Sequence, residues 1–141
     1  MVEGSRYVDV GVFVYWLGGH PVYGERSYEW IRRIEAATPR EYLTSSLTVY
    51  EALAVLAGLT GRKLSDQEFV QDVVEAFTRL RGLRIVPLRG EDLIRAVQLM
   101  EEYQVDYEDA LHLAVALRAG VIAVVSSDED WERTPIPRVF W

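Results

Sequence analysis

The chain has 141 residues, half of them hydrophobic, which suits one compact domain with a buried core. It has no cysteine and only two histidines, so disulfides, thiol nucleophiles and zinc sites built from sulfur or imidazole are excluded, and any metal must be held by oxygen. The net charge of −7 argues against broad electrostatic binding to nucleic acid, unless cations bound among clustered acids offset it. We find no signal-peptide pattern and no apolar run of membrane-spanning length, and therefore expect a cytoplasmic protein without a membrane partner.

Short apolar segments alternate with helical patterns along the whole chain. In order, the sequence predicts a strand at 6–10, helices at 13–17 and 25–37, a strand at 42–45, helices at 47–57 and 66–80, a strand at 83–88, helices at 91–103 and 106–119, and strands at 121–125 and 138–141. Strands separated by helices favour a parallel sheet that is covered on both faces. We therefore predict a single three-layer α/β/α domain over residues 1–141, with a central, mainly parallel sheet.

Four acidic residues fall where such a sheet would bring them together. Asp9 follows the first strand and Asp128 follows the 121–125 strand, and ligands of open α/β sheets gather beyond the carboxyl ends of the strands. Glu51 and Asp109 lie in the first turns of helices that loops at the same edge would introduce. The sequence therefore predicts that these four carboxylates converge.

Each of these acids also has a simpler, local interpretation. Asp9 has the position of a helix N-cap, and Thr48-x-x-Glu51 is a capping-box pattern. Asp109 lies where negative charge favours a helix N-terminus by itself, and Asp128 has the position of an ordinary turn residue. Against a purely local role, Glu51 shares a helical face with apolar residues, where a carboxylate needs a charged or hydrogen-bonded partner.

Close carboxylates have a chemical use when cations share their site. They repel one another, and some would stay protonated without a cation. Hard divalent ions such as Mg²⁺ and Mn²⁺ take oxygen ligands, and a water molecule bound to them is activated to attack phosphorus. Acids at this edge therefore indicate metal-dependent phosphodiester hydrolysis that needs no protein nucleophile.

Four segments of the chain resemble the motifs of the PIN-domain nucleases and, within them, of the VapC-type toxins. The segments are Tyr7-Val-Asp-Val-Gly-Val-Phe-Val-Tyr15, Leu47-Thr-Val-Tyr-Glu-Ala-Leu53, Asp106-Tyr-Glu-Asp-Ala-Leu-His-Leu-Ala114 and Ser126-Ser-Asp-Glu-Asp-Trp131. The Asp-Ala-Leu-His-Leu-Ala run is the most specific of them. The resemblance covers nearly the whole chain and implies a PIN-like fold.

The resemblance also implies a function and a set of site residues. It implies that one or two Mg²⁺ or Mn²⁺ ions are bound by the catalytic acids Asp9, Glu51, Asp109 and Asp128. It further implies that Asp130 assists from behind these ligands and that Ser127 hydrogen-bonds an acid or a phosphate. The implied activity is endoribonuclease hydrolysis of RNA by the toxin of a VapBC-type toxin–antitoxin pair. The implied partners are the RNA substrate, a small antitoxin protein and a second copy of the chain in a homodimer.

One departure from the family keeps a rival open. Gly11 stands two residues after the first Asp, where the family often has Asn or Ser, so a side-chain hydrogen bond near the metal or substrate is missing. The main alternative is therefore a catalytically weak or inactive PIN-like module that binds RNA or regulates a partner. A phosphoaspartate receiver domain with Asp9 as the acceptor is less well supported, because no Asp-x-Asp pattern occurs there and the only lysine, Lys63, is poorly placed.

Overall fold

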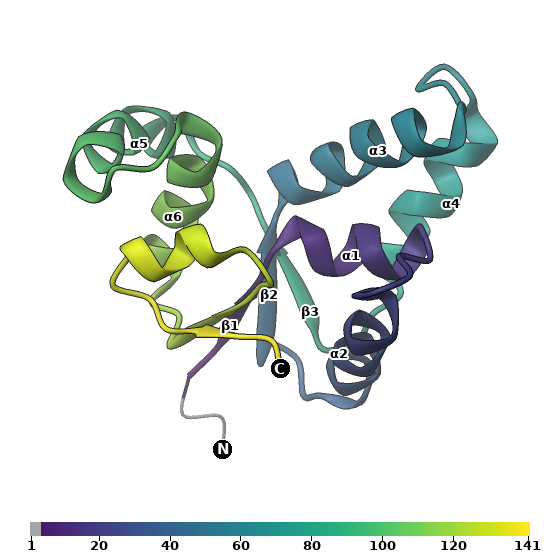
Figure 1. Ribbon diagram of the computed structural model, residues 1–141, viewed down its shortest axis with the longest axis horizontal. Helices are drawn as coiled ribbons and strands as arrows, with labels where there is room; N and C mark the ends of the chain where they lie inside the picture. Colours follow the sequence, from purple (N-terminus) through teal and green to yellow (C-terminus); the bar gives the residue numbers. More distant parts are fainter. Residues whose placement is uncertain (1–3) are drawn as a thin grey trace.

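Five parallel strands with helices on both faces make up the computed structural model, which describes residues 4–141 (Figure 1). In chain order the elements are β1 (Arg6–Val8), α1 (Val10–Leu17), α2 (Gly24–Ala36), β2 (Tyr42–Ser45), α3 (Ser46–Thr60), α4 (Gln67–Thr78), β3 (Leu83–Val86), α5 (Gly90–Tyr103), α6 (Tyr107–Ala119), β4 (Ala123–Val125), the 3₁₀ helix η1 (Glu129–Arg133) and β5 (Arg138–Val139). The strand order is β3-β2-β1-β4-β5, and each neighbouring pair is parallel. The predicted α/β architecture with a parallel central sheet is confirmed. Within residues 4–141, no helix is both long and apolar enough to cross a membrane.

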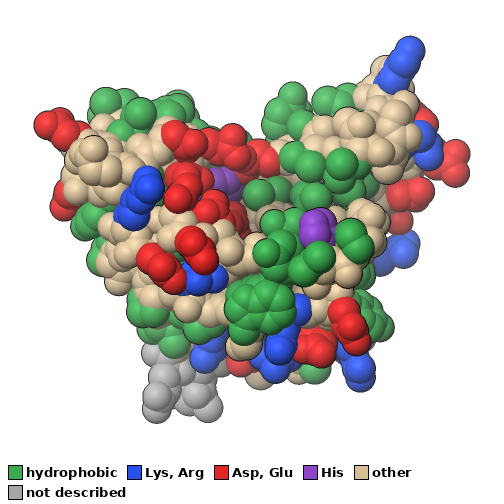
Figure 2. All heavy atoms as spheres, in the orientation of Figure 1, with side chains coloured by type: hydrophobic (Ala, Val, Ile, Leu, Met, Phe, Trp, Pro, Cys, Tyr) green, Lys and Arg blue, Asp and Glu red, His purple; other side chains and the backbone are tan. Residues whose placement is uncertain are grey.

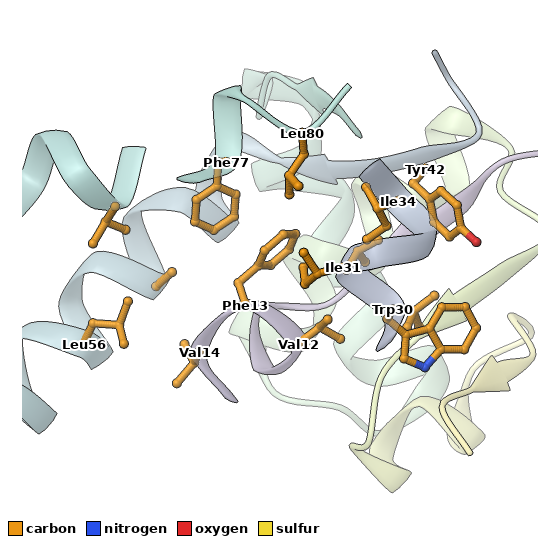
Figure 3. Packing of buried hydrophobic residues seen from close by; sticks show 14 of the residues in the cluster. Val12, Phe13, Val14, Trp30, Ile31, Ile34, Tyr42, Leu56, Phe77 and Leu80 are labelled. Atoms are coloured by element: carbon orange, nitrogen blue, oxygen red, sulfur yellow. The ribbon is translucent and has the colours of Figure 1, made fainter. Parts of the chain in front are cut away.

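Alternation along the strands divides the hydrophobic core between the two faces of the sheet. Tyr7 packs with residues of α5 and α6, whereas the next residue, Val8, packs with residues of α1 to α4. On the second of these faces, the rings of Phe13 in α1 and Phe77 in α4 have their centroids 4.2 Å apart, and Figure 3 shows the two side chains together. The sheet is therefore buried between two apolar layers.

The pairing register fixes which residues meet at the carboxyl edge of the sheet. Val8 of β1 pairs with Val125 of β4, and each is the last residue of its strand. The backbone N–H of Asp9 donates to the Val125 carbonyl at 3.0 Å. Asp9 and Ser126, which follow the paired residues, therefore leave the sheet side by side.

Two helix starts decide between the local interpretations of the acids. Helix α1 begins at Val10, earlier than predicted, because the Asp9 carboxylate accepts the Val10 N–H at 2.9 Å and caps the helix. The cap interpretation of Asp9 is thus confirmed. The capping-box interpretation of Thr48-x-x-Glu51 is wrong, because Ser45 caps α3 by accepting the Leu47 N–H at 3.0 Å. Glu51 therefore finds its partner in another part of the fold.

A buried ion pair ties α6, which carries Asp109, to the start of α5. Asp92 is 2% exposed and accepts N–H groups of the Arg118 guanidinium at 3.0 and 2.8 Å. Its carboxylate also accepts the Arg89 backbone N–H at 2.8 Å, and Arg118 donates to the Pro87 carbonyl at 2.9 Å. The hydrogen bonds from Arg118 are the largest cause of a pKa of Asp92 below its ordinary value of 3.8, and the lowering effects outweigh burial, which acts in the opposite direction. The pair thereby fixes one end of α6.

Asp92→Asn is expected to lower the free energy of unfolding by about 3 kcal/mol at neutral pH, because Arg118 loses its buried charged partner. A carboxylate whose pKa falls on folding stabilises the protein above its unfolded pKa, and that stabilisation is lost as the pH falls through the folded pKa. The difference between parent and variant should therefore be constant above about pH 5 and shrink toward about pH 3. Urea unfolding at a series of pH values measures this difference, with Asp72→Asn on the exposed side of α4 as the control. A difference that persisted unchanged in acid would contradict the assignment.

Candidate metal centre

Three carboxylates meet at the carboxyl edge of the sheet. Oxygens of Asp109, Asp128 and Asp130 all lie within 4.8 Å of one another. Asp109 is in the first turn of α6, where its backbone N–H donates to the Asp106 carboxylate at 2.8 Å, and Asp128 caps η1 by accepting the Asp130 N–H at 2.9 Å. Figure 2 shows acidic side chains gathered in the hollow between the α5–α6 side of the molecule and the α3 side. The caps that start these two helices therefore also fix the backbone beneath the acids.

Asp9 lies beside this cluster and is held by three hydrogen-bond donors. One of its oxygens accepts the Val10 N–H, and the other accepts the Ser126 hydroxyl at 2.6 Å and the Trp131 indole N–H at 3.2 Å. The Ser126 hydroxyl in turn accepts the backbone N–H of Asp128 at 3.0 Å. Only 9% of Asp9 is exposed. Ser126 and Trp131 therefore fix the Asp9 carboxylate against the segment that carries Asp128.

Glu51 reaches the same edge from α3 and is bonded to a histidine. One of its carboxylate oxygens hydrogen-bonds Nε2 of His112, and Nδ1 of His112 lies 2.6 Å from the Tyr7 hydroxyl. No N–H or hydroxyl group among residues 4–141 donates to the other oxygen, Oε2, which is buried. Burial is also the largest cause of a raised pKa at Tyr7, so its hydroxyl stays protonated. A continuous polar chain thus crosses the apolar layer beneath Glu51.

Burial, followed by neighbouring negative charges, raises the pKa of the clustered acids. Burial raises the pKa of Asp109 to about 7, and the charges of neighbouring acids, those of Asp106 and Asp128 first, add to the shift. Burial likewise raises the pKa of Asp128, with further contributions from Asp130 and Asp9. In the metal-free protein these groups therefore compete for protons instead of ionising independently.

Glu51 shares a hydrogen bond with Glu108 and is the ionised member of this pair. Burial alone would raise its pKa, but hydrogen bonds from His112 and Glu108 outweigh that effect and lower the pKa. Burial would lower the pKa of His112, but the hydrogen bond to Glu51 outweighs it and raises the pKa. Glu108 has its pKa raised to about 7, first by its hydrogen bond to Glu51 and then by burial. Near neutral pH, the proton shared by the two carboxyl groups therefore belongs to Glu108.

The donor chemistry of this edge fits a hard divalent cation. All the candidate ligand atoms are carboxylate oxygens, which Mg²⁺ and Mn²⁺ favour. A cation would relieve the repulsion that raises the pKa of Asp109. It would also bind Oε2 of Glu51, to which no N–H or hydroxyl group of residues 4–141 donates. There it would compete with the Glu108 carboxyl group, which shares a hydrogen bond with Glu51. Three carboxylates are close enough to hold the ion together: those of Asp109, Asp128 and Asp130.

This group contains part of the predicted ligand set and one further residue. Its members are Asp109 and Asp128, which were predicted as ligands, and Asp130, which was expected to assist from behind the ligands. Asp9 and Glu51 are not members of it, although the charge of Asp9 acts on both Asp109 and Asp128. Asp9 is bonded to Ser126 and Trp131, and Glu51 to His112.

The serine that contacts an acid is the neighbour of the one expected. The Ser127 hydroxyl lies 3.3 Å from the Tyr15 hydroxyl, whereas Ser126 donates to Asp9. Successive side chains of extended backbone point to opposite sides, so only one residue of a serine pair can face the acid. His112 was also missed as the partner of Glu51, although an imidazole in the apolar stripe of α6 signals a need for a polar partner.

A family model of the PIN domain matches residues 6–137. The chain belongs to the PIN-domain family. The fold is shared with VapC20 of Mycobacterium tuberculosis, a toxin that cleaves the sarcin–ricin loop (TM-score 0.74, 17% identity, 97% of this chain and 100% of that one). It is also shared with a toxin–antitoxin complex from Klebsiella pneumoniae (TM-score 0.67, 20% identity, 96% of this chain and 96% of that one). A third structure with this fold is VapBC2 from Rickettsia felis bound to promoter DNA (TM-score 0.68, 15% identity, 95% of this chain and 96% of that one). No curated protein matches the sequence.

Membership of the PIN family confirms the resemblance read from the sequence motifs. PIN domains are nucleases, and the match covers each segment that carries a clustered acid. Identities of 15 to 20% to the solved structures establish the shared fold. The acid cluster of this PIN domain therefore lies in a fold whose established chemistry is the cleavage of nucleic acid.

Asp109→Asn is expected to stabilise the metal-free protein, because it removes one of the repelling charges. Folding raises the pKa of the Asp109 carboxyl group from 3.8 to about 7. This shift does not destabilise the folded protein below pH 3.8, and it destabilises the protein increasingly as the pH rises toward 7. Allowing for solvent screening at this half-buried group, we expect a gain of about 1 kcal/mol at pH 8 in chelator, and a smaller gain near pH 5.

Thermal unfolding in EDTA and in Mn²⁺ measures both halves of this prediction. Mn²⁺ should raise the melting temperature of the parent more than that of Asp109→Asn, with Asp72→Asn as the control for loss of a distant charge. A variant no more stable than the parent in EDTA at pH 8 would contradict the proposed repulsion.

Proposed function

We propose that this PIN domain is a metal-dependent endoribonuclease that hydrolyses RNA phosphodiester bonds, and that it is the toxin of a VapBC-type pair. The observation that carries the proposal is the group of three carboxylates, Asp109, Asp128 and Asp130, within 4.8 Å at the carboxyl edge of a PIN fold. We further propose that Asp9 and Glu51 complete the site from its border.

The protein's own groups have distinct tasks in this reaction. Asp109, Asp128 and Asp130 would hold one or two Mg²⁺ or Mn²⁺ ions, and Oε2 of Glu51, to which no N–H or hydroxyl group of residues 4–141 donates, would complete the ligand set. When bound, the metal supplies an activated water molecule and stabilises negative charge on the phosphate. Glu108, whose pKa is about 7, is protonated in about half of the molecules at pH 7, which reduces the repulsion that an incoming phosphodiester meets.

The position of Gly11 bears on the rival proposal of an inactive RNA-binding module. A Cβ atom at Gly11 would lie 3.2 Å from Cε2 of Tyr15, so the tyrosine ring already covers this place. The Tyr15 hydroxyl extends to within 3.3 Å of the Ser127 hydroxyl, directly before Asp128 in the chain. Tyr15 thus brings a hydroxyl group toward the edge where the family often has an Asn or Ser side chain. The hydroxyl of Tyr15 thus supplies a polar group in place of the missing Asn or Ser side chain, which supports an active nuclease over an inactive module.

Asp9→Asn and Asp128→Asn are each expected to reduce RNA cleavage at least about 100-fold, because metal-assisted charge stabilisation amounts to several kcal/mol. The assay uses a quenched fluorescent RNA pool with Mn²⁺, Mg²⁺ or chelator. Asp72→Asn removes the same charge from the exposed side of α4 and should leave the rate unchanged.

The outcomes of this assay separate the two proposals. Cleavage by the parent that is lost on chelation and in both variants supports the nuclease. Saturable RNA binding by the parent without cleavage in any metal would overturn it in favour of the binding module. Equal cleavage by parent and variants would mean that the acids are not the site.

An antitoxin and a second copy of the chain are the proposed protein partners. The solved relatives include toxin–antitoxin complexes, which supports an antitoxin here. Two patches of exposed apolar side chains support self-association: Tyr50, Val55 and Leu59 on α3, and Leu93, Ile94 and Val97 on α5. In a two-fold dimer, the α5 patch of each copy would pack on the α3 patch of the other.

Ile94→Glu is expected to shift the protein toward monomers, because it places a charge in the α5 patch, where the Ile94 side chain is 71% exposed. Sedimentation velocity over a range of concentrations measures the change. Arg95→Glu introduces the same side chain on another side of α5 and should leave self-association intact. A parent that sediments as a monomer at every concentration would rule out the dimer.

A further inference from the structure

A chain of three polar side chains, two of them buried, runs from the core of the sheet to the acid site. Tyr7 on β1 is fully buried, His112 on α6 is 3% exposed, and only 13% of the Glu51 side chain on α3 is accessible. The Tyr7 hydroxyl lies 2.6 Å from Nδ1 of His112, and Nε2 of His112 bonds one oxygen of Glu51. Three elements far apart in the sequence are thus connected by two hydrogen bonds inside an apolar layer.

The donor and acceptor roles along this chain are determined at the Glu51 end. An ionised carboxylate can only accept, so Nε2 of His112 must carry the hydrogen that joins it to Glu51. The Tyr7 hydroxyl can donate or accept, so it can bond Nδ1 whether or not that nitrogen carries a hydrogen. With both ring nitrogens bonded, the imidazole cannot rotate without losing a buried hydrogen bond.

The consequence falls on the second oxygen of Glu51. Because His112 holds the first oxygen, the carboxylate plane is fixed and Oε2 lies buried without an N–H or hydroxyl donor from residues 4–141. A buried carboxylate oxygen without a donor is unfavourable unless a cation or another group completes it. The hydrogen bonds from Tyr7 and His112 therefore fix the orientation of Oε2 at the acid edge of the sheet, where its partner is a cation or the Glu108 carboxyl group that shares a hydrogen bond with Glu51.

We propose that Tyr7 and His112 are positioning residues that fix the Glu51 carboxylate in the orientation in which it binds the divalent cation. The inference rests on the proposed metal-dependent function. It goes beyond that function by assigning a role to two buried residues that do not touch the metal, the water or the RNA. Groups that orient a ligand in this way commonly change metal affinity by 10- to 100-fold when they are removed.

The test compares Tyr7→Phe, which deletes only the hydroxyl, with the parent protein. We expect Mn²⁺ to bind Tyr7→Phe about 10-fold more weakly, as measured by the electron paramagnetic resonance of free Mn²⁺. The Nε2–H signal of His112 in ¹H–¹⁵N spectra, protected in the parent by burial and hydrogen bonding, should broaden or disappear. His20 is the only other histidine and provides an internal reference.

Two further comparisons separate positioning from general support of the core. Tyr42→Phe removes a hydroxyl from another buried tyrosine, on the other face of the sheet, and should leave Mn²⁺ affinity unchanged. His112→Gln keeps a donor for Glu51 and an acceptor for Tyr7, so it should retain more Mn²⁺ affinity than His112→Leu. All the measurements are made well below the melting temperature of the least stable variant.

The outcomes distinguish failure of this inference from failure of the proposed function. A parent that binds Mn²⁺, together with a Tyr7→Phe variant of equal affinity and an unchanged His112 signal, would overturn the positioning role alone. A parent that binds no Mn²⁺ would overturn both proposals. Loss of affinity in Tyr7→Phe and His112→Leu, with Tyr42→Phe unaffected, supports the positioning role.

Discussion

Repulsion among carboxylates at the carboxyl edge of the sheet is the constraint on which the rest of the structure depends. Burial and neighbouring charges raise the pKa of Asp109 to about 7, so the metal-free protein holds these acids together against their own electrostatics. What holds them is topology. Val8 and Val125 pair in parallel at the ends of their strands, and the residues that follow leave the sheet at one place. The two apolar layers stabilise this pairing and so offset the repulsion.

Two aromatic residues join the apolar layer to the acids. Trp131 is 5% exposed, its ring lies 6.1 Å from that of Tyr7, and its indole N–H donates to Asp9. Tyr7 is fully buried and directs its hydroxyl at His112 beneath Glu51. Each residue combines a large apolar ring with one polar atom that contacts or supports an acid. The geometry of the site is therefore coupled to the packing of the core, and substitutions remote from solvent act on the carboxylates.

Local pattern predicts much of the fold and only part of the site. The alternation of strands and helices predicts the order of the elements and the edge where Asp9 and Asp128 leave the sheet. The Thr48-x-x-Glu51 pattern misled because a capping box and a carboxylate with a distant partner look alike in sequence, and His112 is 61 residues away. Asp130 joins the group of three carboxylates because of the 3₁₀ turn after Asp128. Ser126 and not Ser127 bonds Asp9 because of the strand register. Neither is encoded in residue spacing alone.

The negative charge of the chain and the proposed RNA substrate are compatible if the cation precedes the RNA. Without metal, a phosphodiester would approach acids that already repel one another, and close like charges in a half-buried site are unfavourable. A bound divalent ion offsets part of the negative charge at this edge and places there a positive centre that a phosphate can approach. The remaining surface still carries the excess of acidic over basic residues, 22 against 15, and disfavours non-specific contact with the RNA backbone. Under the proposed function, the acidity of the protein therefore confines the substrate to the metal-bearing edge, and the cation takes part in recognition as well as in hydrolysis.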